Sequence, residues 1–138
     1  MKKFLLSCCS VAVLWGNFSL GMAADSYETT LLNQINLYRQ ENNLAPLQLN
    51  EHLNQLAVQH STFMQQQNEL SHKMFKERFR AAKRPSCVEN VGWNYQTGSD
   101  QFLGWKHSSG HNKNMLAPQM TQVGLAKVGA YVTFFACQ

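Results

Sequence analysis

The C-terminal end of the chain constrains the fold more than any other segment. Two apolar, β-rich runs, residues 122–127 and 130–136, surround Val128-Gly129 and are typical of a hairpin. The second run has large or apolar side chains on both of its faces: Val132, Phe134 and Ala136 on one, Tyr131 and Phe135 on the other. A sheet that is apolar on both faces needs cover on both. The sequence therefore predicts an α+β fold, a three-layer α-β-α sandwich.

Apolar residues at helical spacing predict two long helices before the hairpin. The first covers about residues 25–41, where Asp25 and Glu28 have the spacing of a capping box. The second begins after the cap residue Asn50 and ends near residue 67. Each presents one apolar face, as expected for a helix that packs on a sheet.

A shorter helix, a strand and a fourth helix come next. The inward residues of the short helix are Phe75, Phe79 and Ala82. Residues 88–95 alternate as in a strand, and Ser99 or Asp100 is predicted to cap the fourth helix. His60 lies on the apolar stripe of the second long helix, so we expect a hydrogen-bonded core histidine there and not a ligand.

The N-terminus predicts export. Residues 1–24 combine a short positive start, a largely apolar run and small residues at the end, as in a secretory signal peptide. Polar residues within the apolar run argue against the alternative of an uncleaved membrane anchor. The prediction is a secreted or periplasmic protein with one domain over residues 25–138.

Two of the four cysteines, Cys8 and Cys9, leave with the predicted signal peptide and lie too near the start for lipid modification after an apolar run. Cys87 and Cys137 remain. In an oxidising compartment they are expected to pair and close a long loop, the alternative being two free thiols. No Cys-x-x-Cys spacing indicates a structural zinc site.

Charge gives little indication of a partner. The net charge falls from +4 to +2 when Lys2 and Lys3 leave, so no nucleic-acid partner is expected. The short third helix has outer positions that are mostly basic: Lys73, Lys76, Arg78, Arg80, Lys83 and Arg84. Such a run is most often a solvated helix face, and the alternative is contact with an anionic membrane surface.

Trp105 to Leu116 is rich in histidine, serine and asparagine between bulky apolar ends. Gly110 permits a sharp backbone change that would aim His111 into a cleft. The alternative is a polar surface turn between helices. Two further stretches bear on this choice, Leu70-Ser71-His72 and Glu89-Asn90-Val91-Gly92-Trp93-Asn94.

Taken in this order and spacing, the motifs resemble the CAP superfamily, the cysteine-rich secretory, antigen 5 and pathogenesis-related class 1 proteins, also called SCP domains. The resemblance is closest to the compact bacterial type and covers nearly all of the mature chain. It implies an α-β-α sandwich with a cleft lined by two histidines and two acids. His72 and His111 resemble the histidines and Glu89 the first acid, while Ser108 stands in place of the second acid.

The resemblance implies zinc as cofactor, bound by His72 and His111 with Glu89 or water completing the shell. Binding is expected to weaken as the histidines protonate near about pH 6 to 6.5. The alternative is a hydrogen-bonded His-Glu-His network that braces the cleft. The predicted partner is a small-molecule, lipid or cell-envelope ligand, and the predicted protein is a monomer.

Two other functions remain open. A hydrolase would use His72 or His111 as general base, Glu89 to orient it, and Ser108 or a metal-bound water as nucleophile. Neither Gly-x-Ser-x-Gly nor His-Glu-x-x-His is present, so this alternative ranks below binding. Lipid or sterol binding is known in some relatives, and the basic third helix is its only local candidate here.

Overall fold

The structure is a computed structural model that describes residues 26–138. The predicted signal peptide and the cap at Asp25 lie outside these residues. The elements in chain order are α1 (Tyr27–Glu41), β1 (Gln48–Leu49), α2 (Glu51–Gln67), α3 (Phe75–Ala82), β2 (Cys87–Trp93), α4 (Gly98–Lys106), α5 (Ser109–Met115), β3 (Gln122–Val128) and β4 (Tyr131–Cys137).

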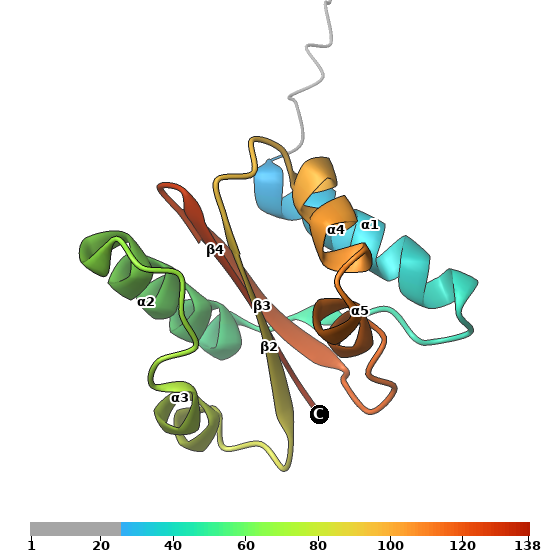
Figure 1. Cartoon of the computed structure of the whole chain (residues 1–138). Coiled ribbons are helices and arrows are strands. Elements are labelled where there is room, and N and C mark those ends of the chain that lie inside the picture. The colour runs from blue at the N-terminus through green and yellow to red at the C-terminus, as the bar shows by residue number, and fades with distance from the viewer. Residues whose placement is uncertain (1–25) are drawn as a thin grey trace, which may run out of the picture.

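One four-stranded sheet forms the middle layer, in the order β1-β3-β4-β2. β1 pairs in parallel with β3, and the other neighbours are antiparallel. Helices α2 and α3 lie on one face of the sheet and α1, α4 and α5 on the other (Figure 1). The predicted three-layer α-β-α sandwich is confirmed.

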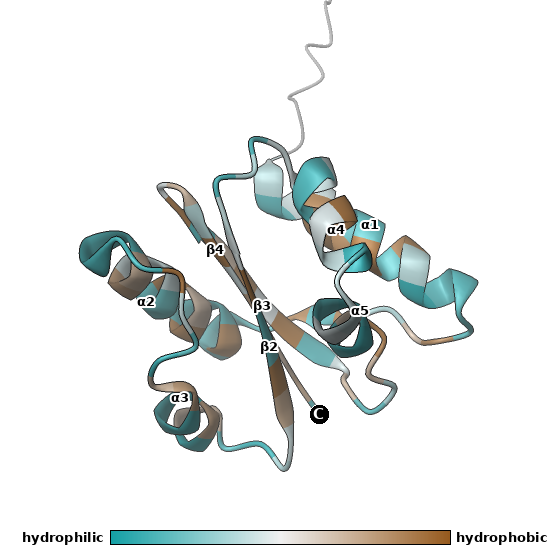
Figure 2. Ribbon diagram, in the orientation of Figure 1, coloured by the Kyte–Doolittle hydropathy of each residue, from teal (hydrophilic) through white to brown (hydrophobic). Residues whose placement is uncertain are grey.

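β4 connects the two halves of the core, because all seven of its residues are buried. Phe134 packs with Trp105 on the α1, α4 and α5 side, whereas Phe135 packs with Leu53 and Leu56 of α2. Figure 2 shows hydrophobic residues on the strands and on the helices of both layers. The prediction that both faces of this strand are covered is therefore correct.

Local capping chemistry explains where the helices begin. α2 starts after Asn50, whose side-chain oxygen accepts from the Leu53 amide at 3.0 Å, as predicted. α4 instead starts after Thr97, whose hydroxyl accepts from the Asp100 amide at 3.1 Å. The predicted cap at Ser99 or Asp100 was wrong because these residues form the first helical turn itself.

Arg39 is a buried cation that the sequence reasoning did not single out. Its guanidinium donates to the carbonyls of Ala45, Met115, Ala117 and Met120 at 2.8–3.0 Å. Burial lowers the pKa of Arg39. These hydrogen bonds attach α1 to the segment that follows α5 and so fix one wall of the layer above the sheet.

The predicted pairing of Cys87 with Cys137 is confirmed by a disulfide bond. The two cysteines are register partners at the start of β2 and the end of β4. The bond therefore fastens an edge strand to the central strand, two residues before Glu89.

Candidate functional site

The candidate site lies at β2, the edge strand beside β4. Side chains of α4 and α5 cap its outer carbonyls: Trp105 Nε1 donates to Val91 O at 3.1 Å, and Asn114 Nδ2 donates to Glu89 O at 3.0 Å. Asn90 Nδ2 also donates to the carbonyl of His111 at 2.9 Å. These bonds protect an edge that would otherwise be open to pairing, and they hold α5 against it.

Helix α5, and not a turn at Gly110, positions His111. Gly110 lies inside α5, and the glycine with positive φ among residues 26–138 is Gly129. The predicted sharp backbone change was wrong, because the segment after Ser108 continues as regular helix. The predicted cleft-facing role of His111 therefore depends on the docking of α5 on β2.

Glu89 is buried on the α2 and α3 face of β2 and accepts three strong hydrogen bonds. His72 Nδ1 lies 2.9 Å from its Oε1. Arg78 donates from Nε to Oε2 at 2.7 Å and from Nη2 to Oε1 at 2.8 Å. The structure therefore brings His72 and Glu89 together, as predicted, and adds a paired guanidinium.

Arg78 corrects the prediction that it lies on the solvated basic face of the third helix. It is only 7% exposed and points at Glu89. The spacing contained a signal for this, because Arg78 follows Phe75 by three residues and precedes Ala82 by four, so the three share one helix face. The residue type concealed it, since arginine is rarely buried unless it is paired.

The charge of Glu89 is maintained by its partners. Burial raises the pKa of this carboxyl, but hydrogen bonds from His72 and Arg78 lower it by more, and the net direction is downward. Glu89 is therefore ionised at neutral pH, and His72 donates its Nδ1 proton to it.

We expect Glu89→Gln to unfold more easily than the parent protein at neutral pH, with a difference that shrinks in acid. The low folded-state pKa of Glu89 stabilises the fold above the unfolded value of about 4.3, and this contribution disappears as pH falls through the folded value. Urea unfolding of both proteins over a pH series measures the difference. Glu69→Gln, which removes an exposed carboxylate paired with Lys73, is the matched control. A difference that does not change with pH would contradict the assignment.

His60 is a core histidine, as predicted. Its Nε2 lies 2.8 Å from the Ser71 carbonyl and 3.8 Å from Glu89 Oε1, and its ring stacks on Phe63. Burial is the main cause of its lowered pKa, so the neutral ring donates to Ser71. His60 therefore fixes the backbone immediately before His72.

His111 and Ser108 lie on the other side of β2. Both line a cavity of about 320 Å³ together with Trp93 and Tyr95. Burial lowers the pKa of His111, and the charge of a protonated His72 lowers it further. His72 does not line this cavity, but Leu70, two residues before it, does.

The donors that remain for a metal here are the ring nitrogens of His72 and His111, because Glu89 already accepts from Arg78. Within residues 26–138, no three histidine, cysteine, aspartate or glutamate side chains form a group that could hold an ion. Both oxygens of Glu89 accept from Arg78, so this carboxylate is placed to orient His72 and not to complete a ligand set. A carboxylate on one ring nitrogen leaves the other free, as is typical of zinc-binding histidines.

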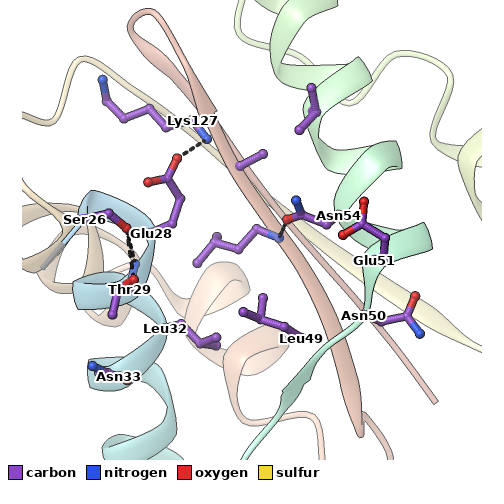
Figure 3. A pocket seen from close by; sticks show the side chains of 13 residues that line it. Ser26, Glu28, Thr29, Leu32, Asn33, Leu49, Asn50, Glu51, Asn54 and Lys127 are labelled. Atoms are coloured by element: carbon purple, nitrogen blue, oxygen red, sulfur yellow. Dashed lines mark hydrogen bonds between the residues drawn. The ribbon is translucent and has the colours of Figure 1, made fainter.

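A larger cavity, of about 480 Å³, lies elsewhere, between α1 and α2 at the open edge of β3 (Figure 3). Its polar groups form hydrogen bonds with the backbone of β3. Asn54 accepts from the Leu125 amide and Glu28 from the Lys127 amide, each at 3.1 Å. Glu28 therefore covers an edge strand instead of completing the predicted capping box, and Ser26 caps α1. We assign the site by its histidines and carboxylate, none of which lines this larger cavity.

The structure is thus an α-β-α domain with a cluster of histidine, carboxylate and guanidinium groups at one edge of its sheet. The chain belongs to the CAP family, described as the cysteine-rich secretory protein family, whose model matches residues 32–138. The family resemblance seen in the sequence motifs is confirmed.

Two curated relatives come from Bacillus subtilis strain 168. The uncharacterized protein YkwD and the uncharacterized membrane protein YlbC are each 28% identical to this chain over 113 residues, or 77% of its length. The aligned region covers 44% of YkwD and 33% of YlbC, so the chain spans less than half the length of either.

Solved bacterial structures share the fold. An extracellular SCP-domain protein from Bacillus anthracis superposes with TM-score 0.76 at 24% identity, covering 81% of this chain and 40% of its own. A cysteine-rich secretory protein from Staphylococcus aureus gives 0.73 at 17%, covering 80% and 38%. An outer surface protein from Borrelia burgdorferi gives 0.71 at 14%, covering 78% and 89%. No helix within residues 26–138 has the length and apolar character needed to cross a bilayer.

Proposed function

We propose that this protein is an exported binding domain, without catalytic activity of its own, that holds zinc or a small cell-envelope ligand between His72 and His111. The hydrogen bond from His72 Nδ1 to Glu89 at 2.9 Å carries the proposal. It directs Nε2 away from the carboxylate, on a side chain that is 53% exposed. Burial favours neutral His111, whose ring nitrogens then have a lone pair for a ligand.

Imidazole nitrogens suit zinc better than they suit magnesium or calcium. A zinc ion bound by His72 and His111 would supply a Lewis-acidic attachment point for an oxygen or nitrogen of a ligand. Arg78 holds Glu89, Glu89 orients His72, and His60 fixes the preceding backbone. The support for binding is thus a preorganised histidine, held by three residues that leave its second nitrogen free.

A hydrolase has less support from the arrangement. The carboxylate orients His72, whereas Ser108 shares its cavity with His111. None of the hydrogen bonds among the described residues joins the Ser108 hydroxyl to a histidine. The nucleophile, base and orienting acid of a triad are therefore divided between the two sides of β2. Ester or peptide turnover that Ser108→Ala abolishes would reverse this ranking.

Lipid binding by the third helix also loses support. Arg78 is withdrawn from the basic face, Lys73 pairs with Glu69 at 2.6 Å, and Arg80 lies 3.7 Å from Glu77. Three of the six basic residues, Lys76, Lys83 and Arg84, are then left without an ion-pair partner among the described residues. Co-sedimentation with anionic vesicles that charge reversal at Arg80 abolishes would restore this alternative.

Zinc titration by calorimetry tests the proposal. We expect saturable heat in the parent protein and none in the His72→Ala, His111→Ala double variant. Glu89→Gln should weaken binding by about 10- to 100-fold, which is typical when the residue that orients a metal ligand is changed. His52→Ala is the control, because His52 is exposed and bonds to the Ala81 carbonyl in a different part of the molecule.

Circular dichroism establishes that each variant is folded before titration. Equal heats in the parent and the double variant would overturn the metal assignment. Heat that is lost in His52→Ala as well would show nonspecific binding to surface histidines.

A further inference from the structure

The cavity beside His111 has an aromatic rim. Trp93 is 51% exposed, and Tyr95 and Leu70 are also exposed at its mouth. Large aromatic side chains that remain exposed around a hollow indicate an interaction site, because burying them would stabilise the isolated protein. The Tyr95 hydroxyl packs closely on Gly104, since a Cβ added to that glycine would come within 2.4 Å of it.

The floor of the same cavity contains an unused hydrogen-bond donor. Gln101 is 1% exposed, and its Nε2 has no partner among the described residues. Its Oε1 lies 3.5 Å from the Tyr27 hydroxyl, and the amide packs against Gly92, another lining residue. A buried amide N–H without a partner destabilises the folded protein. A ligand with an acceptor oxygen would remove this cost.

The lining contains no acidic or basic side chain other than His111. The residues that form it are Leu70, Val91, Gly92, Trp93, Tyr95, Gln101, Gly104, Trp105, Ser108 and His111. None is aspartate, glutamate, lysine or arginine. An anionic headgroup or a cationic peptide would find no opposite charge here. The chemistry matches a neutral ligand with hydroxyl groups and one apolar face.

We propose that this cavity is a subsite for a neutral pyranose ring of a cell-envelope glycan. The C–H face of the ring would stack on Trp93 and Tyr95, and its oxygens would meet Gln101 Nε2 and the Ser108 hydroxyl. This inference deepens the proposed function by naming a ligand class, and it rests on that function only through the shared residue His111. It does not require the metal.

Calorimetric titration of the purified protein with tri-N-acetylchitotriose and with maltotriose tests the subsite. We expect saturable binding of at least one of these neutral trisaccharides. Trp93→Ala should weaken it by about tenfold or more, as for an aromatic anchor in a contact site, whereas Trp93→Phe should retain most of it. Gln101→Met should cost about fivefold to tenfold, the loss of one neutral hydrogen bond. Leu103→Ala, which removes an exposed side chain of α4 outside the cavity, should change nothing.

The titration is repeated with zinc and with a chelator, so that the two proposals can fail separately. Sugar binding that persists without zinc, in a protein that binds no zinc, would retain the subsite and reject the metal. Zinc binding without any saturable sugar heat would reject the subsite. Sugar binding that survives both Trp93→Ala and Tyr95→Ala would also overturn it, because the ring would then bind elsewhere.

Discussion

Arg78→Met is expected to lower the free energy of unfolding by about 3–5 kcal/mol, the usual cost of removing one partner from a buried ion pair. The variant leaves Glu89, whose side chain is 1% exposed, without its two guanidinium hydrogen bonds. The total free energy of unfolding of a single domain is about 5–15 kcal/mol, so a loss of this size should be evident in urea or thermal unfolding.

Arg80→Met is the matched control, because it removes the same type of side chain two residues further along the helix. Arg80 is 73% exposed and lies 3.7 Å from Glu77, so its removal should cost no more than about 1 kcal/mol. Adding Glu89→Gln to Arg78→Met should recover part of the loss, since no unpaired charge then remains buried. Equal effects of Arg78→Met and Arg80→Met would show that the buried pair is not a structural anchor.

Removing the disulfide should have an effect of similar size. The bond joins positions 50 residues apart, and closing a loop of that length restricts the unfolded chain by about 4 kcal/mol. Unfolding of the parent protein with and without a reductant, beside the Cys87→Ser, Cys137→Ser double variant, measures this. The reductant should destabilise the parent and leave the double variant unchanged. A stability that does not respond to reductant would show that the bond contributes little.

The architecture was predictable because its signals are local. The alternation in β4 indicated cover on both faces, and the helical stripe after Asn50 placed both the helix and its buried His60. The pairing of Cys87 with Cys137 was predicted because export to an oxidising compartment was expected and two cysteines remain in the mature chain. Each of these inferences uses neighbouring residues or residue type alone, and the structure agrees with it.

The electrostatic centre of the site was not predictable in the same way. Whether an arginine is buried depends on a partner that only the tertiary fold supplies, and Glu89 is in a different element from Arg78. Arg39 illustrates the same point: it follows Ile35 by four residues on the buried face of α1, yet three of its four carbonyl partners lie 76 to 81 residues further on. The helical spacing of Arg78 and Arg39 indicated that both side chains face inward. Arginine is usually exposed, and the residue type therefore favoured the opposite prediction.

The position of the two histidines on opposite sides of β2 has a mechanical consequence. His72 belongs to the layer of α2 and α3, whereas His111 belongs to α5, on the other side of the strand that separates their layers. A ligand that binds both histidines would link two helical layers that are otherwise joined through the sheet. Its binding free energy would then add to the free energy of unfolding of the whole domain. Ligand binding would therefore increase resistance to heat and to proteolysis in regions far from the two histidines.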